Sequence, residues 1–256
     1  MALVHYIKST RFPLAIYFLE VILGAFYISN FNIFNIDLIY LFFIFISFQP
    51  LYYAIYVIND IIDYPSDRIN PKRQHRPIAS GKITIKNALI FSIILILFSF
   101  LIAINLSYIL FLFELFFLIY NLIYSFLLKK IPYIDTLAGG VTHTARFVMG
   151  ISLFGFFREY GLAFAILIFV TTCLLIRRMN EIKNYKGVRH PMKYYSYKKI
   201  VIFWIVLGFI IFILFLLSSN LEKAAISIIF LLYLIIIFGY NYINYIKELF
   251  DFIANY

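Results

Sequence analysis

Four residues with oxygen-bearing side chains follow the second long apolar stretch of the sequence: Asn59, Asp60, Asp63 and Asp67. If the preceding helix continues through them, their spacing places all four on one side of that helix. Carboxylates crowded in this way repel one another unless a cation lies between them. A small set of hard oxygen ligands suits Mg²⁺, which is often bound jointly by carboxylates and substrate phosphates. The spacing therefore predicts a magnesium-binding motif.

Basic residues follow these acids directly, at Arg68, Lys72, Arg73 and Arg76. Their side chains could bind the phosphates of a substrate held by the same metal. The alternative is a charged loop whose acids and bases only pair with one another. The regular acidic spacing, and the change from acidic to basic residues along the chain, favour a binding site.

A second polar segment, near residues 177–197, contains many bases and one acid. Arg177 and Glu181 are four residues apart and could pair on one helix face, although an isolated exposed salt bridge stabilises little. We predict that Arg177, Arg178, Glu181 and Arg189 help to bind a polyphosphorylated substrate. The alternative is that the bases only orient the chain in a membrane.

Arg146 lies inside an apolar stretch, where an ionisable residue is costly and by default indicates function. With Asp135, Gly139 and His143 it falls at spacings of four, four and three residues, which gives a polar stripe on one helix face. Arg146 either binds a substrate phosphate or pairs with a carboxylate to hold helices together. The sequence leaves both alternatives open.

The elements that must position these residues are membrane spans. Hydrophobic residues make up 64% of the 256 residues, charged residues 13%, and the mean hydropathy is +0.95, whereas about 25% charged residues is usual in soluble proteins. Crossing a bilayer takes about 20 apolar residues. Eight such runs lie near residues 11–29, 38–58, 87–105, 108–127, 135–155, 160–178, 198–218 and 223–247. We expect an all-α, polytopic transmembrane bundle of about eight spans, with a ninth left open, forming a single domain over residues 1–256.

Charge distribution predicts the orientation of this bundle. Nearly all lysines and arginines fall on one side of the predicted spans, and such an excess marks the cytoplasmic side. Both termini and both polar loops, near residues 59–86 and 177–197, are therefore expected in the cytoplasm, and the chain in the cell (inner) membrane. The net charge of +10 is explained by these loops beside anionic lipids, without any nucleic acid.

Asn59, Asp60, Asp63 and Asp67 match an N-D-x-x-D-x-x-x-D signature, and on this motif the sequence resembles the UbiA superfamily of intramembrane prenyltransferases. The resemblance covers about residues 10–245. It implies a helical bundle, usually of nine spans, in which Mg²⁺ on two cytoplasmic-side motifs holds the diphosphate of an isoprenoid donor.

The second motif departs from the usual aspartate-rich pattern, because Arg177, Arg178 and Glu181 stand there. In this it resembles one branch, the decaprenyl-phosphate phosphoribosyltransferases. That branch's D-R-x-H-P-x-K-x-x-R-P-I-A pattern is matched at Asp67, Arg68, Pro71, Arg76, Pro77, Ile78 and Ala79, and its R-x-x-L-x-x-Y pattern at Arg189, Met192 and Tyr195. Asn70 replaces the histidine, Arg73 replaces the lysine, and no ninth apolar run follows Lys247.

The resemblance implies that phosphoribosyl diphosphate binds with its diphosphate on Mg²⁺ and that a polyprenyl phosphate attacks its anomeric carbon. Catalysis would rest on Asp60, Asp63, Asp67 and Arg76, with Asn59 completing the metal ligands. Phosphate binding would involve Arg68, Lys72, Arg73, Arg76, Arg146, Arg177, Arg178, Glu181, Arg189 and Tyr195. One alternative is transfer of an isoprenoid from its diphosphate to an aromatic or other small acceptor. Another is a lipid-binding or transport protein without catalytic activity.

Overall fold

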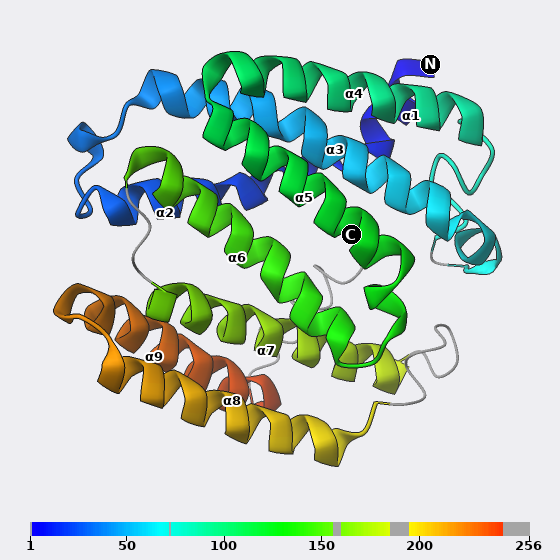
Figure 1. Cartoon of the computed structure of the whole chain (residues 1–256). Coiled ribbons are helices and arrows are strands. Elements are labelled where there is room, and N and C mark those ends of the chain that lie inside the picture. The colour runs from blue at the N-terminus through cyan, green and yellow to red at the C-terminus, as the bar shows by residue number, and fades with distance from the viewer. Residues whose placement is uncertain (1, 72, 156–159, 185–194, 243–256) are drawn as a thin grey trace. The chain divides into compact units, whose positions relative to one another are not determined.

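The computed structural model describes residues 2–71, 73–155, 160–184 and 195–242, and every regular element in these residues is a helix (Figure 1). The all-helical prediction is therefore confirmed. The α-helices are α1 (Ala2–Ser9), α2 (Leu19–Ile28), α3 (Leu38–Ile69), α4 (Ile85–Leu106), α5 (Tyr108–Phe126), α6 (Ile134–Phe154), α7 (Tyr160–Asn184), α8 (Tyr197–Leu217) and α9 (Asn220–Tyr242). Short 3-10 helices are η1 (Phe12–Phe18), η2 (Ile33–Asn35) and η3 (Leu128–Lys130).

Each of the eight predicted apolar runs coincides with helical structure in the described residues, the first with η1 and α2 and the others with α3 to α9. Within the part of the chain that the structure describes, four stretches are long and apolar enough to cross a membrane: Leu38–Ile69, Ile85–Leu106, Tyr108–Lys130 and Tyr160–Arg178. Apolar side chains such as Leu97 and Leu101 of α4 are more than 60% exposed. Large apolar side chains left exposed along a whole helix suit a lipid environment. The helices are those of a multi-pass membrane protein.

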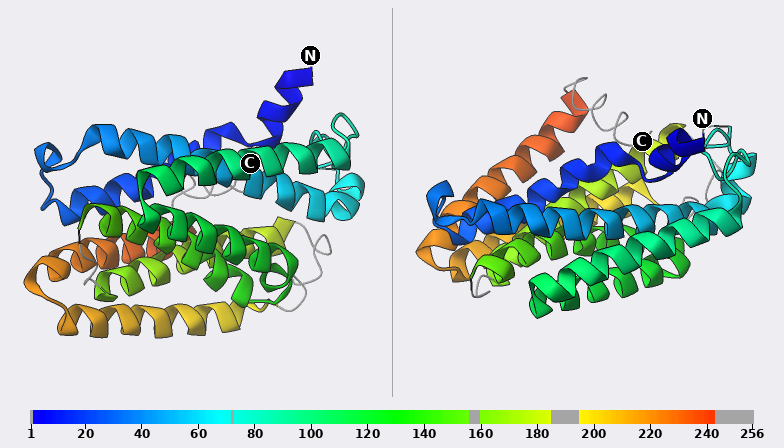
Figure 2. Two further views of the ribbon diagram at one scale, coloured as in Figure 1. Left: turned by 45° about the horizontal axis from the view of Figure 1, so that its top comes forward. Right: turned by 90° about the horizontal axis from the view of Figure 1, so that it is seen from above.

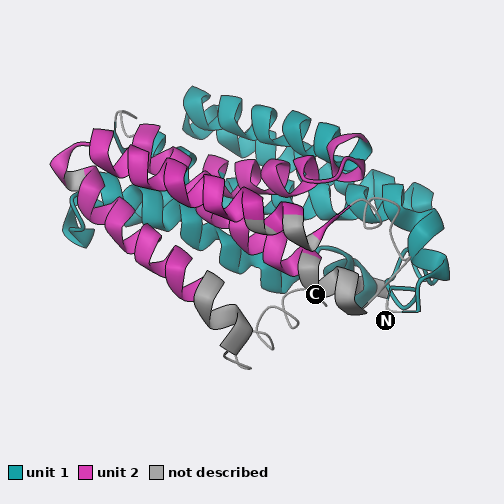
Figure 3. Ribbon diagram, turned by 90° about the horizontal axis from the view of Figure 1, so that it is seen from below, with its two compact units in different colours: residues 1–126, 146–156 teal, residues 127–145, 157–256 magenta. Residues whose placement is uncertain are grey.

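The chain forms two compact units, coloured separately in Figure 3. The first comprises residues 1–126 and 146–156, and the second residues 127–145 and 157–256. Helix α6 contributes to both, because its first part belongs to the second unit and its part from Arg146 onward to the first. In the first unit α3 packs along α4 and α5, and in the second α7, α8 and α9 pack on one another. The pairing of α3 with α4 is visible in both views of Figure 2.

Helix α3 continues into the first polar segment, near residues 59–86. Residues 59–69 are helical, and the connection between α3 and α4 covers residues 70–84. The helix ends at Asn70, whose backbone is extended with ψ 115, because the residue before a proline, here Pro71, is disfavoured in the helical conformation. The second polar segment likewise begins on a helix, since α7 continues to Asn184.

Two glycines bring α2 and α6 together within the first unit. A Cβ atom added to Gly24 would lie 2.1 Å from the carbonyl oxygen of Phe147, and one added to Gly150 would lie 2.1 Å from that of Val21. Only glycine permits such an approach, so the two backbones touch at this crossing.

Candidate functional site

The acidic motif lies on the last turns of α3, as the spacing predicted. The side chains of Asp60 and Asp67 are only 3% and 1% exposed. A separation of seven residues, close to two helical turns, places both on one face. Asn59 and Asp63 lie on the same turns and are partly buried. The end of this helix thus carries buried carboxylates that require cationic partners.

Arg76 provides such a partner from the loop after α3. Its Nη1 donates to Asp60 Oδ1 at 3.1 Å and to Asp67 Oδ2 at 2.6 Å. Arg73 lies on the same side, with Nη1 3.4 Å from Asp67 Oδ1. One nitrogen of Arg76 therefore stands between two carboxylates of the predicted metal motif.

The loop that carries these arginines is fixed by its own apolar residues. Ile78 and Ile83 are buried with Val57 of α3 and Ala88 of α4 in one hydrophobic cluster. Backbone hydrogen bonds, including Ser80 N to the carbonyl oxygen of Arg76 at 2.8 Å, close the turns between them. Burial of the apolar end of the loop thereby holds its basic part against the acids.

A third arginine reaches the acids from a distant part of the chain. Arg11 Nη2 donates to Asp60 Oδ1, and its Cζ lies 5.0 Å from the ring centroid of Tyr56, a cation–π contact. Arg11 has left-handed backbone angles, φ 51 and ψ 50, at the turn between α1 and η1. Sequence reasoning missed this residue because 49 positions separate it from Asp60, and no periodic pattern spans that distance.

Charge coupling within this cluster is reflected in the arginine pKa values. Burial lowers the pKa of Arg11, but Asp60, Tyr56 and Asp67 together raise it by more, so the net pKa is raised. Burial and the nearby Arg11 together lower the pKa of Arg76. The two guanidinium groups therefore compete for the same acids, and an additional anion beside them would relieve their mutual repulsion.

The donor set of this cluster fits a divalent cation. In the described part of the chain no three His, Cys, Asp or Glu side chains converge as a preformed metal site. Yet Asp60 and Asp67 already share one cationic group, Arg76 Nη1, between them. Mg²⁺ is usually bound by one or two carboxylates when substrate phosphates supply further ligands, and Asp60 and Asp67 offer two.

One predicted phosphate-binding residue of this region points away from the acids, and another is not among the described residues. Arg68 is exposed and donates from Nη1 to the hydroxyl of Tyr64 at 3.3 Å. Lys72 lies outside the described residues.

Arg146 is completely enclosed within the first unit, with 2% of its side chain exposed. Its Nε donates to Glu20 Oε2 at 2.6 Å. Its Cζ lies 5.3 Å, 5.1 Å and 5.8 Å from the ring centroids of Tyr17, Tyr52 and Phe117. These contacts favour the second alternative for Arg146, an ion pair that holds helices together.

Two residues of the second polar segment, Arg178 and Tyr195, form a cluster with Asp135 within the second unit. Arg178 Nε donates to Asp135 Oδ2 at 2.7 Å, and the hydroxyl of Tyr195 donates to Asp135 Oδ1. The backbone N–H of Tyr133 donates to the Tyr195 hydroxyl at 2.9 Å. Burial, and then the Asp135 carboxylate, raise the pKa of Tyr195, which keeps it protonated as a donor.

Other predicted residues of this segment are less defined. Arg177 is partly buried near the end of α7. Glu181 lies on the last turn of that helix, and its side chain is outside the described part. Arg189 falls in residues 185–194, also outside the described residues.

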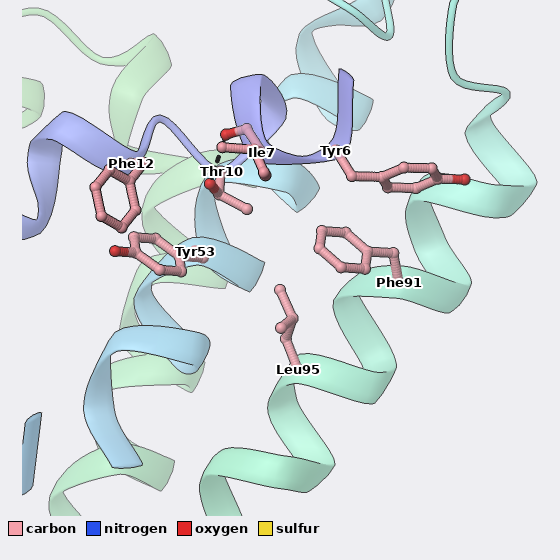
Figure 4. A pocket seen from close by; sticks show the side chains of 7 residues that line it. All are labelled: Tyr6, Ile7, Thr10, Phe12, Tyr53, Phe91 and Leu95. Atoms are coloured by element: carbon pink, nitrogen blue, oxygen red, sulfur yellow. Dashed lines mark hydrogen bonds between the residues drawn. The ribbon is translucent and has the colours of Figure 1, made fainter. Parts of the chain in front are cut away.

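An apolar pocket of about 360 Å³ lies within the first unit (Figure 4). It is lined by Tyr6, Ile7, Thr10, Phe12, Tyr53, Phe91 and Leu95. The only aliphatic hydroxyl among them, that of Thr10, donates to the carbonyl oxygen of Ile7 at 2.7 Å. Thr10 and Phe12 flank Arg11 in the sequence, so the pocket adjoins the chain segment that supplies an arginine to the acids.

Comparison with protein families identifies the chain. The model of the UbiA prenyltransferase family matches residues 18–248. The chain belongs to this family. The matched range includes α2 to α9 with both polar segments, but not Arg11.

Solved structures of UbiA homologues share the fold. A homologue from Archaeoglobus fulgidus bound to GPP and Mg²⁺ superposes with a TM-score of 0.74 at 18% identity, over 98% of this chain and 95% of that one. The same homologue bound to DMAPP and Mg²⁺ gives a TM-score of 0.76 at 18% identity, over 97% and 94% of the two chains. At this identity the likeness establishes the UbiA fold.

A curated relative is the uncharacterized protein y4nM of Sinorhizobium fredii, 29% identical over 140 residues. The match covers 54% of this chain and 27% of that protein. The matched region thus spans about a quarter of the length of this curated relative.

Proposed function

We propose that this UbiA-family chain is a Mg²⁺-dependent intramembrane transferase that moves phosphoribosyl from phosphoribosyl diphosphate to a polyprenyl phosphate. The observation that carries the proposal is the composition of the second polar segment. Arg178 of this segment donates a hydrogen bond to Asp135, and residues 177–197 contain no pair of aspartates. One acidic cluster and several arginines suit two phosphorylated substrates better than one diphosphate and an uncharged acceptor.

The acidic end of α3 would hold the metal through Asp60, Asp63 and Asp67, with Asn59 assisting. Mg²⁺ bound there would supply positive charge to the diphosphate and so assist its departure. Arg11, Arg73 and Arg76 already border the acids, and in the substrate complex they would also bind the diphosphate oxygens. The second polar segment would also contribute to phosphate binding, through Arg177, Arg178, Glu181, Arg189 and Tyr195.

In the proposed reaction an oxygen of the polyprenyl phosphate forms a bond to the anomeric carbon of the ribose. The bond from that carbon to the diphosphate breaks, and the diphosphate leaves with the electron pair. A phosphate nucleophile is already anionic and needs no strong base. The work of the protein is then positioning and stabilisation of the leaving charge by arginines fixed beforehand.

A second candidate is transfer of an isoprenoid group to a small acceptor. The structures of the Archaeoglobus fulgidus homologue bound to GPP and to DMAPP favour it. Both candidates use the same acidic cluster and the same metal, so they differ in the substrates and not in the first motif.

The deciding experiment offers the purified protein, in detergent with Mg²⁺, a polyprenyl phosphate and either labelled phosphoribosyl diphosphate or a labelled isoprenoid diphosphate with a panel of small acceptors. Label passing from phosphoribosyl diphosphate into the lipid fraction would support the proposal. Transfer only from the isoprenoid diphosphate would replace it by the second candidate, and binding without turnover would indicate a non-catalytic lipid-binding or transport protein.

A matched pair of variants on α3 controls this assay. Asp67→Asn removes a buried carboxylate of the acidic cluster and should abolish transfer. Asp37→Asn changes the exposed N-cap of the same helix, where Asp37 accepts from Tyr40 N at 2.9 Å, and asparagine caps equally well. Equal losses in both variants would show that the effect of Asp67→Asn is on folding.

We also propose that both polar segments and both termini face the cytoplasm in the cell membrane. The chain has one cysteine, Cys173, so a Cys173→Ser background permits single-site labelling. A cysteine at exposed Ser80 should react only from the cytoplasmic side, and one at exposed Ser219 only from the opposite side. The reverse pattern would invert the topology.

A further inference from the structure

A continuous series of contacts joins the enclosed Arg146 to the acidic cluster within the first unit. Arg146 lies over the ring of Tyr52, with its Cζ 5.1 Å from the centroid. The hydroxyls of Tyr52 and Tyr56, one turn apart on α3, are 2.8 Å apart. Arg11 lies over the ring of Tyr56 at 5.0 Å and donates to Asp60. Two tyrosines of α3 therefore connect two arginines that come from other elements.

One end of this series is fixed by close packing. Arg146 is bonded to Glu20 at 2.6 Å. Each of these residues lies one helical turn before a glycine of the α2–α6 crossing, Gly24 after Glu20 and Gly150 after Arg146, where the backbones touch. Arg146 is 2% exposed, and this ion pair at a close helix crossing has little freedom to move, because separating it would take a charge partner from an arginine in an apolar interior. Arg146 is thereby held in place, and its guanidinium limits the movement of the Tyr52 ring that it contacts.

The other end needs support. Arg11 follows α1 in a left-handed backbone conformation, φ 51, which is unfavourable for a side-chain-bearing residue and persists only where surrounding contacts hold it. At the acids, its guanidinium contacts the Tyr56 ring and the Asp60 carboxylate. The contact with the Tyr56 ring limits rotation of the Arg11 guanidinium. A hydrogen bond to the Asp60 carboxylate alone would leave the guanidinium free to rotate about that hydrogen bond.

We propose that Tyr56 is a positioning residue: held by Tyr52, and through it by Arg146, it orients Arg11 toward the diphosphate that binds at the acidic cluster. The inference rests on the proposed function of that cluster as a diphosphate site. It assigns Arg146 an indirect role through Tyr52 and Tyr56, without contact to substrate.

The test is binding of inorganic diphosphate with Mg²⁺ to the full-length protein, measured by calorimetry in detergent. Tyr56→Phe keeps the ring and loses the hydroxyl bond, and should raise the diphosphate Kd several-fold. Tyr56→Leu removes the ring and should raise it about tenfold or more. Tyr52→Phe removes the same hydroxyl bond, so it should match Tyr56→Phe, and the double variant should be no worse than either alone.

A double-mutant cycle with Arg11→Ala is decisive, because it isolates the coupling between two residues. Once Arg11 is absent, Tyr56→Leu should cause no further loss of diphosphate binding. Tyr40→Phe, on the same helix and packed on Phe154 at 5.5 Å, is the matched control and should leave both the Kd and the unfolding temperature unchanged.

The outcomes separate this inference from the function on which it rests. Wild-type protein that binds no Mg²⁺-diphosphate would refute the proposed diphosphate site, and the positioning role with it. Wild-type binding combined with additive effects of Arg11→Ala and Tyr56→Leu would refute the positioning role alone. Variants of Tyr56 that lower only the unfolding temperature, with unchanged Kd, would also overturn it.

Discussion

Arg76 Nη1 lies 2.6 Å from Asp67 Oδ2 and so joins the acidic motif to the loop that follows it. The same nitrogen lies 3.1 Å from Asp60 Oδ1. A guanidinium nitrogen thus stands where two carboxylates of α3 converge, which is also where the acidic spacing predicted a metal. If Mg²⁺ binds here as proposed, the arginine and the metal would share these oxygens, and that sharing makes distinct predictions for variants of each.

Substitution of Arg76 should reduce transfer strongly. Removing one fixed charge from a leaving-group site typically lowers kcat by about 100- to 1000-fold, and Arg76→Ala is expected within that range. Arg76→Lys should recover only part of the activity, because lysine lacks the planar fork that binds carboxylate and phosphate together. The measurement is kcat/KM in detergent. Lys82→Ala, an exposed base in the same loop, is the control, and an equal loss there would point to general electrostatics instead of a site.

Removal of Mg²⁺ should abolish turnover, and re-addition should restore it. Because Arg76 and the proposed metal would share Asp60 and Asp67, substitutions of Arg76 and of Asp67 should shift the Mg²⁺ requirement in opposite directions. Asp67→Asn should weaken Mg²⁺ binding by about 1.4 kcal/mol. The Mg²⁺ concentration that gives half-maximal thermal stabilisation should then rise by about tenfold. Arg76→Ala should lower it while reducing turnover. A shift in the same direction for both variants would show that the arginine and the metal do not compete.

The local part of this site was predictable from the sequence. A seven-residue separation is close to two helical turns, so the shared face of Asp60 and Asp67 follows from helix geometry as soon as the helix continues through them. Apolar run length likewise sufficed to find the helices, because crossing a bilayer fixes a minimum length. The first part of the polar segment is helical because charged residues are compatible with a helix, and α3 ends just before Pro71.

The long-range part was not predictable. Arg11 and Asp60 are 49 residues apart, and Arg146 and Glu20 are 126 apart. No periodicity relates such pairs, because their proximity depends on how the helices pack. An arginine in an apolar stretch did signal that a carboxylate or phosphate must meet it, but only the crossing at Gly24 placed Glu20 there.

The Asp135 carboxylate should be important for stability. It accepts from Arg178, near the end of α7, and from Tyr195, just before α8, so one side chain joins both ends of the second polar segment. Removing one partner of a buried ion pair costs about 3–5 kcal/mol, and Asp135→Ala should destabilise the protein by that amount. Asp135→Asn retains acceptor capacity and should cost less. The measurement is denaturant or thermal unfolding in detergent.

Asp37→Ala provides the scale for this comparison. It removes an exposed helix cap, which is typically worth about 1 kcal/mol. If Asp135→Ala is no more destabilising than Asp37→Ala, the contacts to Arg178 and Tyr195 contribute little, and the joining role of Asp135 is refuted.

The apolar pocket beside the Arg11 segment offers a last prediction about the lipid substrate. Its walls, including Phe12 and Leu95, suit a hydrocarbon chain, and we propose that it accommodates part of one. Leu95→Trp would fill the pocket and exclude some methylene groups of the lipid chain from it. Burial of each methylene is worth about 0.8 kcal/mol, so exclusion of two should raise KM for a long-chain lipid phosphate by about tenfold. A short-chain analogue should be affected less. Leu97→Trp, on an exposed position of the same helix, is the matched control. An equal rise of KM for short and long chains, or for both variants, would show that the pocket holds no substrate chain.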